Sequence, residues 1–383
     1  MSQELSTLDC VLTTLEGEIP VRVPSLCMGM DYEFIYNFMN SPYALTEQDL
    51  TLFEKDNLYF GVPNNQYLFA KFSPTKILPS GLDAKIDLCL HITYPGNSKK
   101  LEKQDVFVIP DGGLNNFTVK KNGIPVNWYK GPSLINKDKI QEYWNREKDL
   151  KPQKMAFQNF SRNRKTMLKK YDIVIMDGLE GPFENCTMGI GLANFAKFVR
   201  KEPQFLRKHM EFQWQVIEEP SLRLLMKTKP YIVMIGDDYG YNLGLQIPLK
   251  QWQEFIKPIL KRFVDIVHEG GAKFVLHSCG DIHEIFPDLE EMGVDGVESL
   301  QPQINDLEMY RKKYPKITLL GAINDTEMLK NQSPEFIRNH VKLEIEKLGK
   351  KGGYIPGPTN MLLDQPVENV IALFKAIHEF GKY

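Results

Sequence analysis

The amino-acid sequence predicts an α/β fold, and within this class a TIM (β/α)8 barrel with a β-rich insertion in its N-terminal part. From residue 171 onward, short apolar runs alternate with longer segments of helical period, which is typical of consecutive βα units. No Gly-x-Gly-x-x-Gly motif follows a predicted strand, which disfavours a dinucleotide-binding sheet. The chain has 383 residues, a length that one barrel with insertions reaches. We therefore predict a single domain over residues 1–383.

The first third of the chain predicts a mixed region followed by the insertion. Residues 21–24 indicate a first strand and residues 31–39 a helix. The insertion covers residues 76–131, where strand-like runs follow one another. Its predicted strands are residues 87–93, residues 105–109 and a hairpin over residues 116–126, with Asn122 and Gly123 as the turn.

The second half predicts the barrel itself. Gly293 marks the end of one helix, and Ser333 followed by Pro334 marks the start of another, because serine caps helices and proline suits their first turn. Further helices are predicted over residues 189–200, 252–269 and 368–380. The predicted strands are residues 171–176, 231–235, 274–276, 294–300, 316–320 and 353–356.

Candidate metal ligands follow two neighbouring predicted strands. The strand at residues 274–276 leads into His277 and Cys279, and residues two apart on a strand point to the same face. The next strand carries Glu298, and barrel enzymes keep their chemistry at the carboxyl ends of the strands. Nitrogen, sulfur and oxygen donors together suit Zn²⁺, whereas a thiolate disfavours Mg²⁺ or Ca²⁺. We predict a zinc site formed by His277, Cys279 and Glu298.

Each of these residues also has a structural interpretation. Cys279 is equally compatible with a small buried apolar residue, and His277 with a hydrogen-bonded core histidine. Glu298 can pair with a lysine on the rim of the barrel. The three together favour the metal site, because a buried and unpaired carboxylate is costly.

Two further loops are candidates for the walls of the pocket. In residues 236–242, we assign Tyr239, Tyr241 and Asp238 to catalysis and Asp237 and Asn242 to substrate binding. The alternative is a tight turn before a helix, which the glycines of this segment also fit. In residues 181–186, Phe183 is a candidate pocket wall, and Glu184 and Asn185 are candidate substrate contacts or helix caps.

The composition excludes several classes of protein. A net charge of −2 gives no electrostatic case for nucleic-acid binding. No apolar run approaches the length of a membrane span, and the N-terminus lacks the pattern of a signal peptide. Five cysteines, odd in number and widely spread, indicate reduced thiols. We expect a soluble, cytoplasmic protein without a membrane partner.

The chain resembles the uroporphyrinogen decarboxylase superfamily, and within it the corrinoid-linked methyltransferases. The resemblance lies in residues 237–242, 271–280, 293–296, 321–324, 352–356 and 366–369. It implies a single TIM barrel. In this branch, zinc is held by a His-x-Cys pair and a later cysteine, with a carboxylate nearby. His277 and Cys279 match the pair, and Glu298 matches the carboxylate position.

The sequence departs from both neighbouring patterns. The decarboxylases carry an arginine-rich motif near the N-terminus, and residues 21–30 contain nothing like it. The later cysteine of the methyltransferases is expected near residues 357–360, where this chain has Pro358, Thr359 and Asn360. Its loss disfavours the members that methylate a small thiol such as coenzyme M. Water, substrate or a side chain such as Asn360 then completes the zinc site, and we also assign Asn360 to substrate binding.

The resemblance implies methyl transfer from a methoxylated or methylated small molecule to the Co(I) corrinoid, a cobalamin-type cofactor, of a separate partner protein. An aryl methyl ether is one candidate donor. The alternatives are a uroporphyrinogen-type decarboxylase, a methylcobamide:thiol methyltransferase and a non-catalytic barrel that binds a corrinoid protein. A homodimer and a monomer both remain open.

Overall fold

Parallel strands arranged as a barrel dominate the structure, which is a computed structural model. It describes residues 6–30, 34, 37–38, 84–88, 99–100, 106–108, 112–119, 125–152 and 154–383. In this part of the chain, eight strands form one sheet in the order β1-β2-β7-β8-β11-β12-β13-β14, and neighbouring strands in this order pair in parallel. The strands are β1 (Leu26–Cys27), β2 (Ala84–Leu88), β7 (Val174–Glu180), β8 (Ile232–Gly236), β11 (Lys273–His277), β12 (Gly296–Glu298), β13 (Thr318–Ile323) and β14 (Tyr354–Pro358).

The first and last strands of this sheet lie side by side. A side chain at Gly357 of β14 would collide with the Leu26 carbonyl of β1, so only glycine permits this approach. Just beyond these strands, Met30 and Leu362 form a parallel bridge, and the Leu362 amide donates to the Gly29 carbonyl at 2.9 Å. The sheet therefore curls round on itself, and the predicted TIM-barrel class is confirmed.

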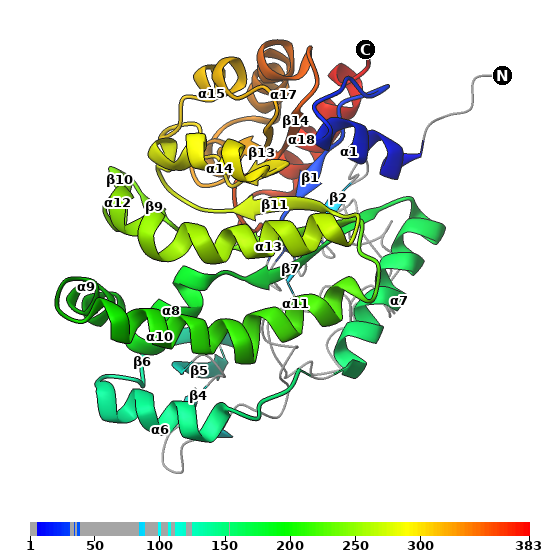
Figure 1. Cartoon of the computed structure of the whole chain (residues 1–383). Helices are drawn as coiled ribbons and strands as arrows, with labels where there is room; N and C mark the ends of the chain where they lie inside the picture. The colour runs from blue at the N-terminus through cyan, green and yellow to red at the C-terminus, as the bar shows by residue number, and fades with distance from the viewer. Residues whose placement is uncertain are drawn as a thin grey trace.

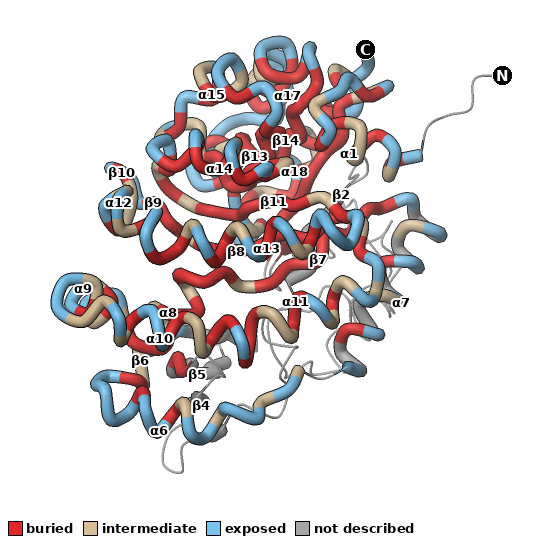
Figure 2. Tube along the Cα trace, in the orientation of Figure 1, coloured by how far each residue is buried: buried red, intermediate tan, exposed pale blue. Residues whose placement is uncertain are grey.

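Apolar side chains fill the interior of the barrel and its amino-terminal end. Val174, Met176, Met234 and Val275 belong to one buried cluster from alternate positions of neighbouring strands. Helix α1 (Thr7–Leu15) contributes the buried side chains of Val11 and Leu15 to the same cluster. Figure 2 shows the buried strands surrounded by helices whose outer faces are exposed. Because these apolar side chains close the amino-terminal end of the barrel, a functional site is expected at the carboxyl end of the strands.

Helices cover the outside of the barrel, as Figure 1 shows. Among the described residues, no helix combines the length and the apolar character needed to cross a membrane. The helices after α1 are α6 (Lys137–Glu147), α7 (Lys154–Tyr171), α8 (Pro182–Ile190), α9 (Leu192–Lys201), α10 (Pro203–Gln213), α11 (Glu219–Met226), α12 (Leu249–Gln251), α13 (Lys257–Glu269), α14 (Phe286–Met292), α15 (Leu307–Lys313), α16 (Met328–Asn331), α17 (Pro334–Glu344) and α18 (Val367–Phe380), with a 3₁₀ turn η3 (His283–Ile285).

Three segments of the outer helices are π-helical, η1 (Trp214–Glu218), η2 (Trp252–Ile256) and η4 (Ile345–Gly349). The first two stand directly before helices that carry Pro220 and Pro258 in their first turn. Proline lacks an amide proton and crowds the carbonyl four residues earlier. The wider π turn accommodates this ring without ending the helix.

A second, antiparallel sheet lies beside the barrel. It consists of β3 (Lys99–Lys100), β4 (Val106–Val108), β5 (Gly113–Val119) and β6 (Pro125–Pro132), and the predicted hairpin is the β5–β6 pair. The predicted turn residues Asn122 and Gly123 lie outside the described residues. The range predicted for the insertion, 76–131, also contains β2, which the structure places in the barrel sheet. The antiparallel part is therefore the shorter segment from β3 to β6.

Other sequence predictions differ from the structure at particular places. The first strand is β1, not residues 21–24, and most of the helix predicted over 31–39 falls outside the described residues. The helix predicted over 189–200 is two helices, α8 and α9, because Gly191 between them has φ 80°. The predicted helix signals are confirmed at Gly293, which is left-handed, and at Ser333, whose side chain accepts from the Phe336 amide.

A buried histidine lies between α6 and α10. His209 is 1% exposed, and its Nδ1 accepts a hydrogen bond from Trp144 Nε1 at 3.1 Å. Burial lowers the pKa of His209 to about 3. The folded protein therefore keeps this imidazole neutral at pH values where the unfolded chain protonates it.

We expect this histidine to weaken the protein in mild acid. Because the unfolded chain takes up the proton near pH 6.5 and the folded chain only near pH 3, stability falls as the pH falls through this window. His209→Asn keeps an acceptor for Trp144 and removes the titration. Its free energy of unfolding should fall less between pH 7 and pH 5 than that of the wild type, by up to about 2 kcal/mol. Urea unfolding at both pH values measures this, with His378→Asn, an exposed histidine, as the control. An equal loss in His209→Asn and wild type would contradict the prediction.

Candidate metal centre

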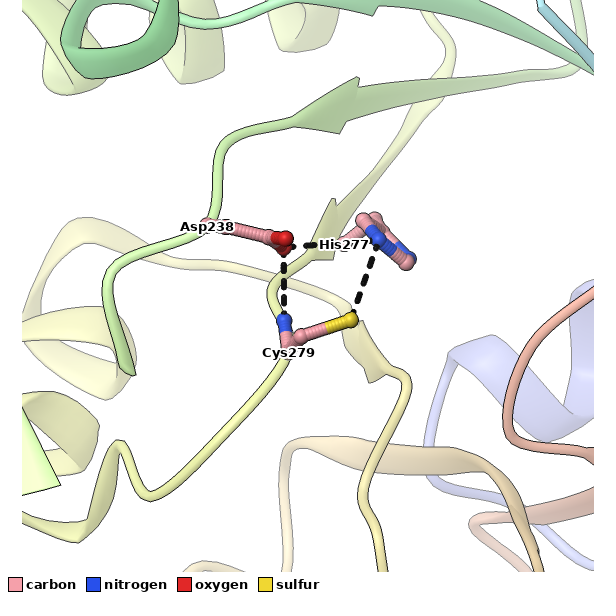
Figure 3. Close-up of side chains that lie close together, drawn as sticks. All are labelled: Asp238, His277 and Cys279. Atoms are coloured by element: carbon pink, nitrogen blue, oxygen red, sulfur yellow. Dashed lines mark hydrogen bonds and ion pairs between the residues drawn. The ribbon is translucent and has the colours of Figure 1, made fainter. Parts of the chain in front are cut away.

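Three potential metal ligands meet where β8 and β11 end. His277 is the last residue of β11 and stands in register with Gly236, the last residue of β8. Asp238 comes two residues after that end of β8, and Cys279 two residues after His277. Figure 3 shows the three side chains turned toward one point. The shared register of two parallel strands thus assembles a site from two separate loops.

The distances between these side chains fit one ion. His277 Nε2 lies 3.8 Å from Cys279 Sγ and 3.5 Å from Asp238 Oδ1. All three ligand atoms lie within 4.8 Å of one another. Asp238 Oδ1 also accepts a hydrogen bond from the Cys279 amide at 2.7 Å, which joins the two loops.

Glu298 orients the His277 ring from the side opposite Asp238 and Cys279. It stands opposite His277 in the β11–β12 register, is fully buried, and bonds through Oε2 to His277 Nδ1. Burial is the largest single effect on the pKa of His277 and lowers it, but Glu298 and Cys279 together outweigh burial and raise that pKa well above its usual value. Because Glu298 holds one proton at Nδ1, Nε2 is the nitrogen that faces Asp238 and Cys279, and it can bind a metal once its own proton has left.

This donor set fits zinc. One imidazole nitrogen, one thiolate and one carboxylate are a set that Zn²⁺ accepts, and three protein ligands leave the fourth tetrahedral position open. A carboxylate on the far ring nitrogen is the usual support for a metal-binding histidine. The sequence predicted Glu298 as the third ligand, whereas the described residues that come together are Asp238, His277 and Cys279.

Asp237, next to the candidate ligand Asp238, holds the neighbouring loop in place. It is fully buried, and its two oxygens accept from the amides of Phe183 at 3.0 Å and Glu184 at 2.7 Å, at the start of α8. A side chain at Gly181 would collide with the Asp237 carboxylate, so glycine is required there. Burial raises the pKa of Asp237 to about 7, although both amides oppose this shift. Both oxygens of Asp237 therefore cap the start of α8.

Glu184 adds a second acidic group beside the centre. It is half-buried at the first turn of α8. Burial raises the pKa of Glu184 to about 8, and the charges of Asp238 and Asp237 add to this shift while His277 opposes it. The carboxyl group therefore shares the electrostatic environment of the candidate ligands.

Other residues assigned to substrate or catalysis are packed into the core. Tyr239 is 1% exposed and packs edge-on against Trp252, and Phe183 packs against Phe195. Asn185 is buried and donates to Glu180 O and to Glu218 Oε1. These positions favour packing and helix support over contact with a substrate.

The remaining assigned residues are exposed at the rim. Tyr241 is 51% exposed and Asn242 is exposed beside it, in the hairpin of β9 (Gly240–Tyr241) and β10 (Gly244–Leu245). Asn360 is exposed too, and its Oδ1 accepts from the Met361 amide at 2.8 Å.

Two supporting residues were missed by the sequence reasoning. Ser299 places its Oγ 3.4 Å from Cys279 Sγ, and Gln301 Oε1 accepts from the Gly280 amide at 3.0 Å. Both follow β12, in the loop after Glu298. The sequence could have indicated them only by their position at a strand end, just after Glu298. Because serine and glutamine are common in loops, that position alone does not indicate a role.

Comparisons with known proteins agree with this fold. A family model described as uroporphyrinogen decarboxylase (URO-D) matches residues 122–380. Among solved structures, a methyltransferase from Methanosarcina mazei matches with a TM-score of 0.66 and 20% identity, over 98% of this chain and 99% of that chain. A D-psicose 3-epimerase from Clostridium cellulolyticum H10 gives a TM-score of only 0.34 with 11% identity, over 59% of this chain and 77% of that chain. No curated protein matches the sequence.

Fold and site together define an α/β barrel with a candidate metal centre at the carboxyl ends of its strands. The chain belongs to the uroporphyrinogen decarboxylase (URO-D) family, because the family model matches well over half of its length.

We expect Glu298 to support metal binding through the histidine. Glu298→Gln keeps the size of the side chain but removes the charge that holds His277 Nδ1. The dissociation constant for Zn²⁺ should rise about 10-fold to 100-fold, with one ion still bound at saturation. Competition with a chromophoric chelator measures the constant. Glu291→Gln, an exposed glutamate on α14, is the control and should bind as the wild type does. Unchanged affinity in Glu298→Gln would contradict the supporting role.

Proposed function

We propose that this protein is a zinc-dependent methyltransferase that moves a methyl group from a methoxylated or methylated small molecule to the Co(I) corrinoid of a partner protein. The observation that carries the proposal is the convergence of Asp238, His277 and Cys279 at the end of β8 and β11. Membership of the family and the likeness in fold to a methyltransferase from Methanosarcina mazei support it. An aryl methyl ether is one candidate for the donor.

The proposed roles follow from the placement of each side chain. Asp238, His277 and Cys279 would hold zinc, which supplies a Lewis acid for the heteroatom that loses the methyl group. Glu298 keeps the imidazole in the orientation that presents Nε2. The heteroatom keeps the bonding electron pair when the methyl group leaves, and it takes up a proton afterwards. The half-buried Glu184 carboxyl lies at the carboxyl end of the barrel, where the proposal places the substrate.

The surroundings of Thr359 support a methyl donor over a thiol acceptor. The Thr359 carbonyl accepts from Ser299 Oγ at 2.6 Å, and its Oγ1 donates to Asp325 Oδ1 at 2.5 Å. The Thr359 hydroxyl is therefore occupied, and the exposed Asn360 accepts from the Met361 amide. In the proposal, the substrate takes the open position of the zinc.

Zinc content tests the metal part of the proposal. The purified protein should hold one equivalent of zinc, and His277→Ala and Cys279→Ala should each lose most of it while remaining folded. Elemental analysis after gel filtration measures the content, and circular dichroism the fold. Ser221→Ala, a buried serine on α11 away from the site, is the control. Zinc-free wild-type protein, or full zinc content in both variants, would overturn the metal assignment.

Methyl transfer tests the reaction. Free cob(I)alamin, incubated with the zinc-loaded protein and a panel of methoxyaromatics and methylamines, should be methylated with at least one donor, and the change is followed by its absorption spectrum. Cys279→Ala should reduce the rate by about 100-fold or more, since it removes a zinc ligand. Release of CO₂ from a tetrapyrrole carboxylate, with no methylation of cobalamin, would favour the decarboxylase instead. Binding of ligands without either reaction would favour the non-catalytic barrel.

A further inference from the structure

The residue that follows Glu298 has an unusual backbone. Ser299 has φ 70°, a left-handed conformation that serine seldom adopts, and it is fully buried. Along a regular strand, Glu298 and Ser299 would point to opposite faces. The left-handed residue breaks this alternation, so both side chains reach the same His-x-Cys pair. Glu298 bonds to the imidazole of His277, and Ser299 Oγ lies 3.4 Å from Cys279 Sγ.

The single proton of the Ser299 hydroxyl has two acceptors within reach. In this structure the hydroxyl donates to the Thr359 carbonyl at 2.6 Å. Toward Cys279, Ser299 Oγ can then only accept the proton of a thiol. A sulfur that binds a metal carries no proton and accepts hydrogen bonds only. A rotation about the Cβ–Oγ bond redirects the hydroxyl proton from the carbonyl to the sulfur and leaves the heavy atoms in place.

We propose that Ser299 is a positioning residue for the metal-binding thiolate of Cys279, whose hydroxyl turns from the Thr359 carbonyl to the sulfur when the metal binds. Among the described residues, His277 Nε2 is the other polar side-chain atom recorded within hydrogen-bond range of this sulfur, at 3.8 Å. As a metal ligand, that nitrogen has no proton to donate. The Ser299 hydroxyl is then the side-chain donor placed to stabilise the sulfur charge and to fix the direction of its lone pairs.

This inference rests on the metal site of the proposed function, and a spectroscopic test keeps the two apart. The full-length protein is loaded with Co²⁺ alone, and the absorption band for charge transfer from sulfur to cobalt is recorded. In Ser299→Ala this band should move to longer wavelength, because a sulfur that loses a hydrogen bond gives up electron density more easily. Competition between Zn²⁺ and a chelator should show affinity about 10-fold to 100-fold weaker than in the wild type.

Two further variants separate the hydroxyl from the backbone. Alanine is compatible with the left-handed conformation, as Ala322 with φ 66° shows on the next strand. Ser299→Gly removes the hydroxyl and the backbone strain together, so it carries the test if Ser299→Ala does not fold. Ser278→Ala is the matched control: Ser278 is also fully buried and adjoins Cys279, but its Oγ accepts from the Tyr239 amide at 2.9 Å and donates to the Cys279 carbonyl at 3.4 Å, not to the sulfur.

The outcomes are distinct. A shift of the band in Ser299→Ala and Ser299→Gly, with none in Ser278→Ala, is the expected result. An unchanged band in both Ser299 variants, or an equal shift in Ser278→Ala, would overturn the role of Ser299 and leave the metal site intact. Absence of a sulfur-to-cobalt band in the wild-type protein would overturn the metal site and this inference with it.

Discussion

The pairing of a fully buried carboxylate with an imidazole is the interaction on which the site depends. Glu298 lies inside the barrel, where an unpaired charge would be costly, and His277 Nδ1 is the partner that Oε2 finds. This pair is possible only because β11 and β12 run parallel with His277 opposite Glu298. The β11–β8 pairing places the end of β8 opposite His277, so Asp238 lies beside Nε2 of the ring. The two pairings of β11 therefore set the tautomer of the histidine, its direction and the position of its neighbour.

Unusual backbone conformations and close backbone contacts position the remaining parts of the site. They occur at positions that tolerate few residue types. Gly240 and Gly280 let the loop after β8 touch the loop after β11, since a side chain at either would collide with the other loop. Ser299 departs from the strand conformation immediately after Glu298. Such strain persists only where the surroundings fix it, and here the surroundings are the carbonyl of Thr359 and the sulfur of Cys279. The centre is thus held by loops that support one another, on a rigid barrel.

The sequence was sufficient to predict the barrel class and the His277–Cys279 pair, because both depend on local patterns. Apolar runs followed by amphipathic segments identify βα units, and a strand end places two side chains on one face. The roles of Glu298 and Asp238 were not readable in this way, since both are carboxylates at strand ends. Which one faces Nε2 and which one faces Nδ1 depends on the tilt of the imidazole between three strands. Tyr239 was misleading for a similar reason: an aromatic residue in a glycine-rich loop resembles a pocket residue until its burial is known.

The balance of charge around His277 is an argument for a cation that does not depend on any resemblance. Asp238 and Glu298 lie beside the two nitrogens of the His277 ring, and Glu184 and Asp237 are the next acidic groups. Among the described residues, no lysine or arginine forms an ion pair with any of these four carboxyl groups. Burial is the main reason that the carboxyl groups of Glu184 and Asp237 hold their protons up to pKa values of about 8 and 7, and mutual repulsion adds to it. A divalent ion beside Asp238 would relieve that repulsion. Several buried carboxyl groups close together destabilise a barrel that binds no cation, whereas a bound cation would offset this cost. Groups with strongly shifted pKa values are also more common at functional sites than elsewhere.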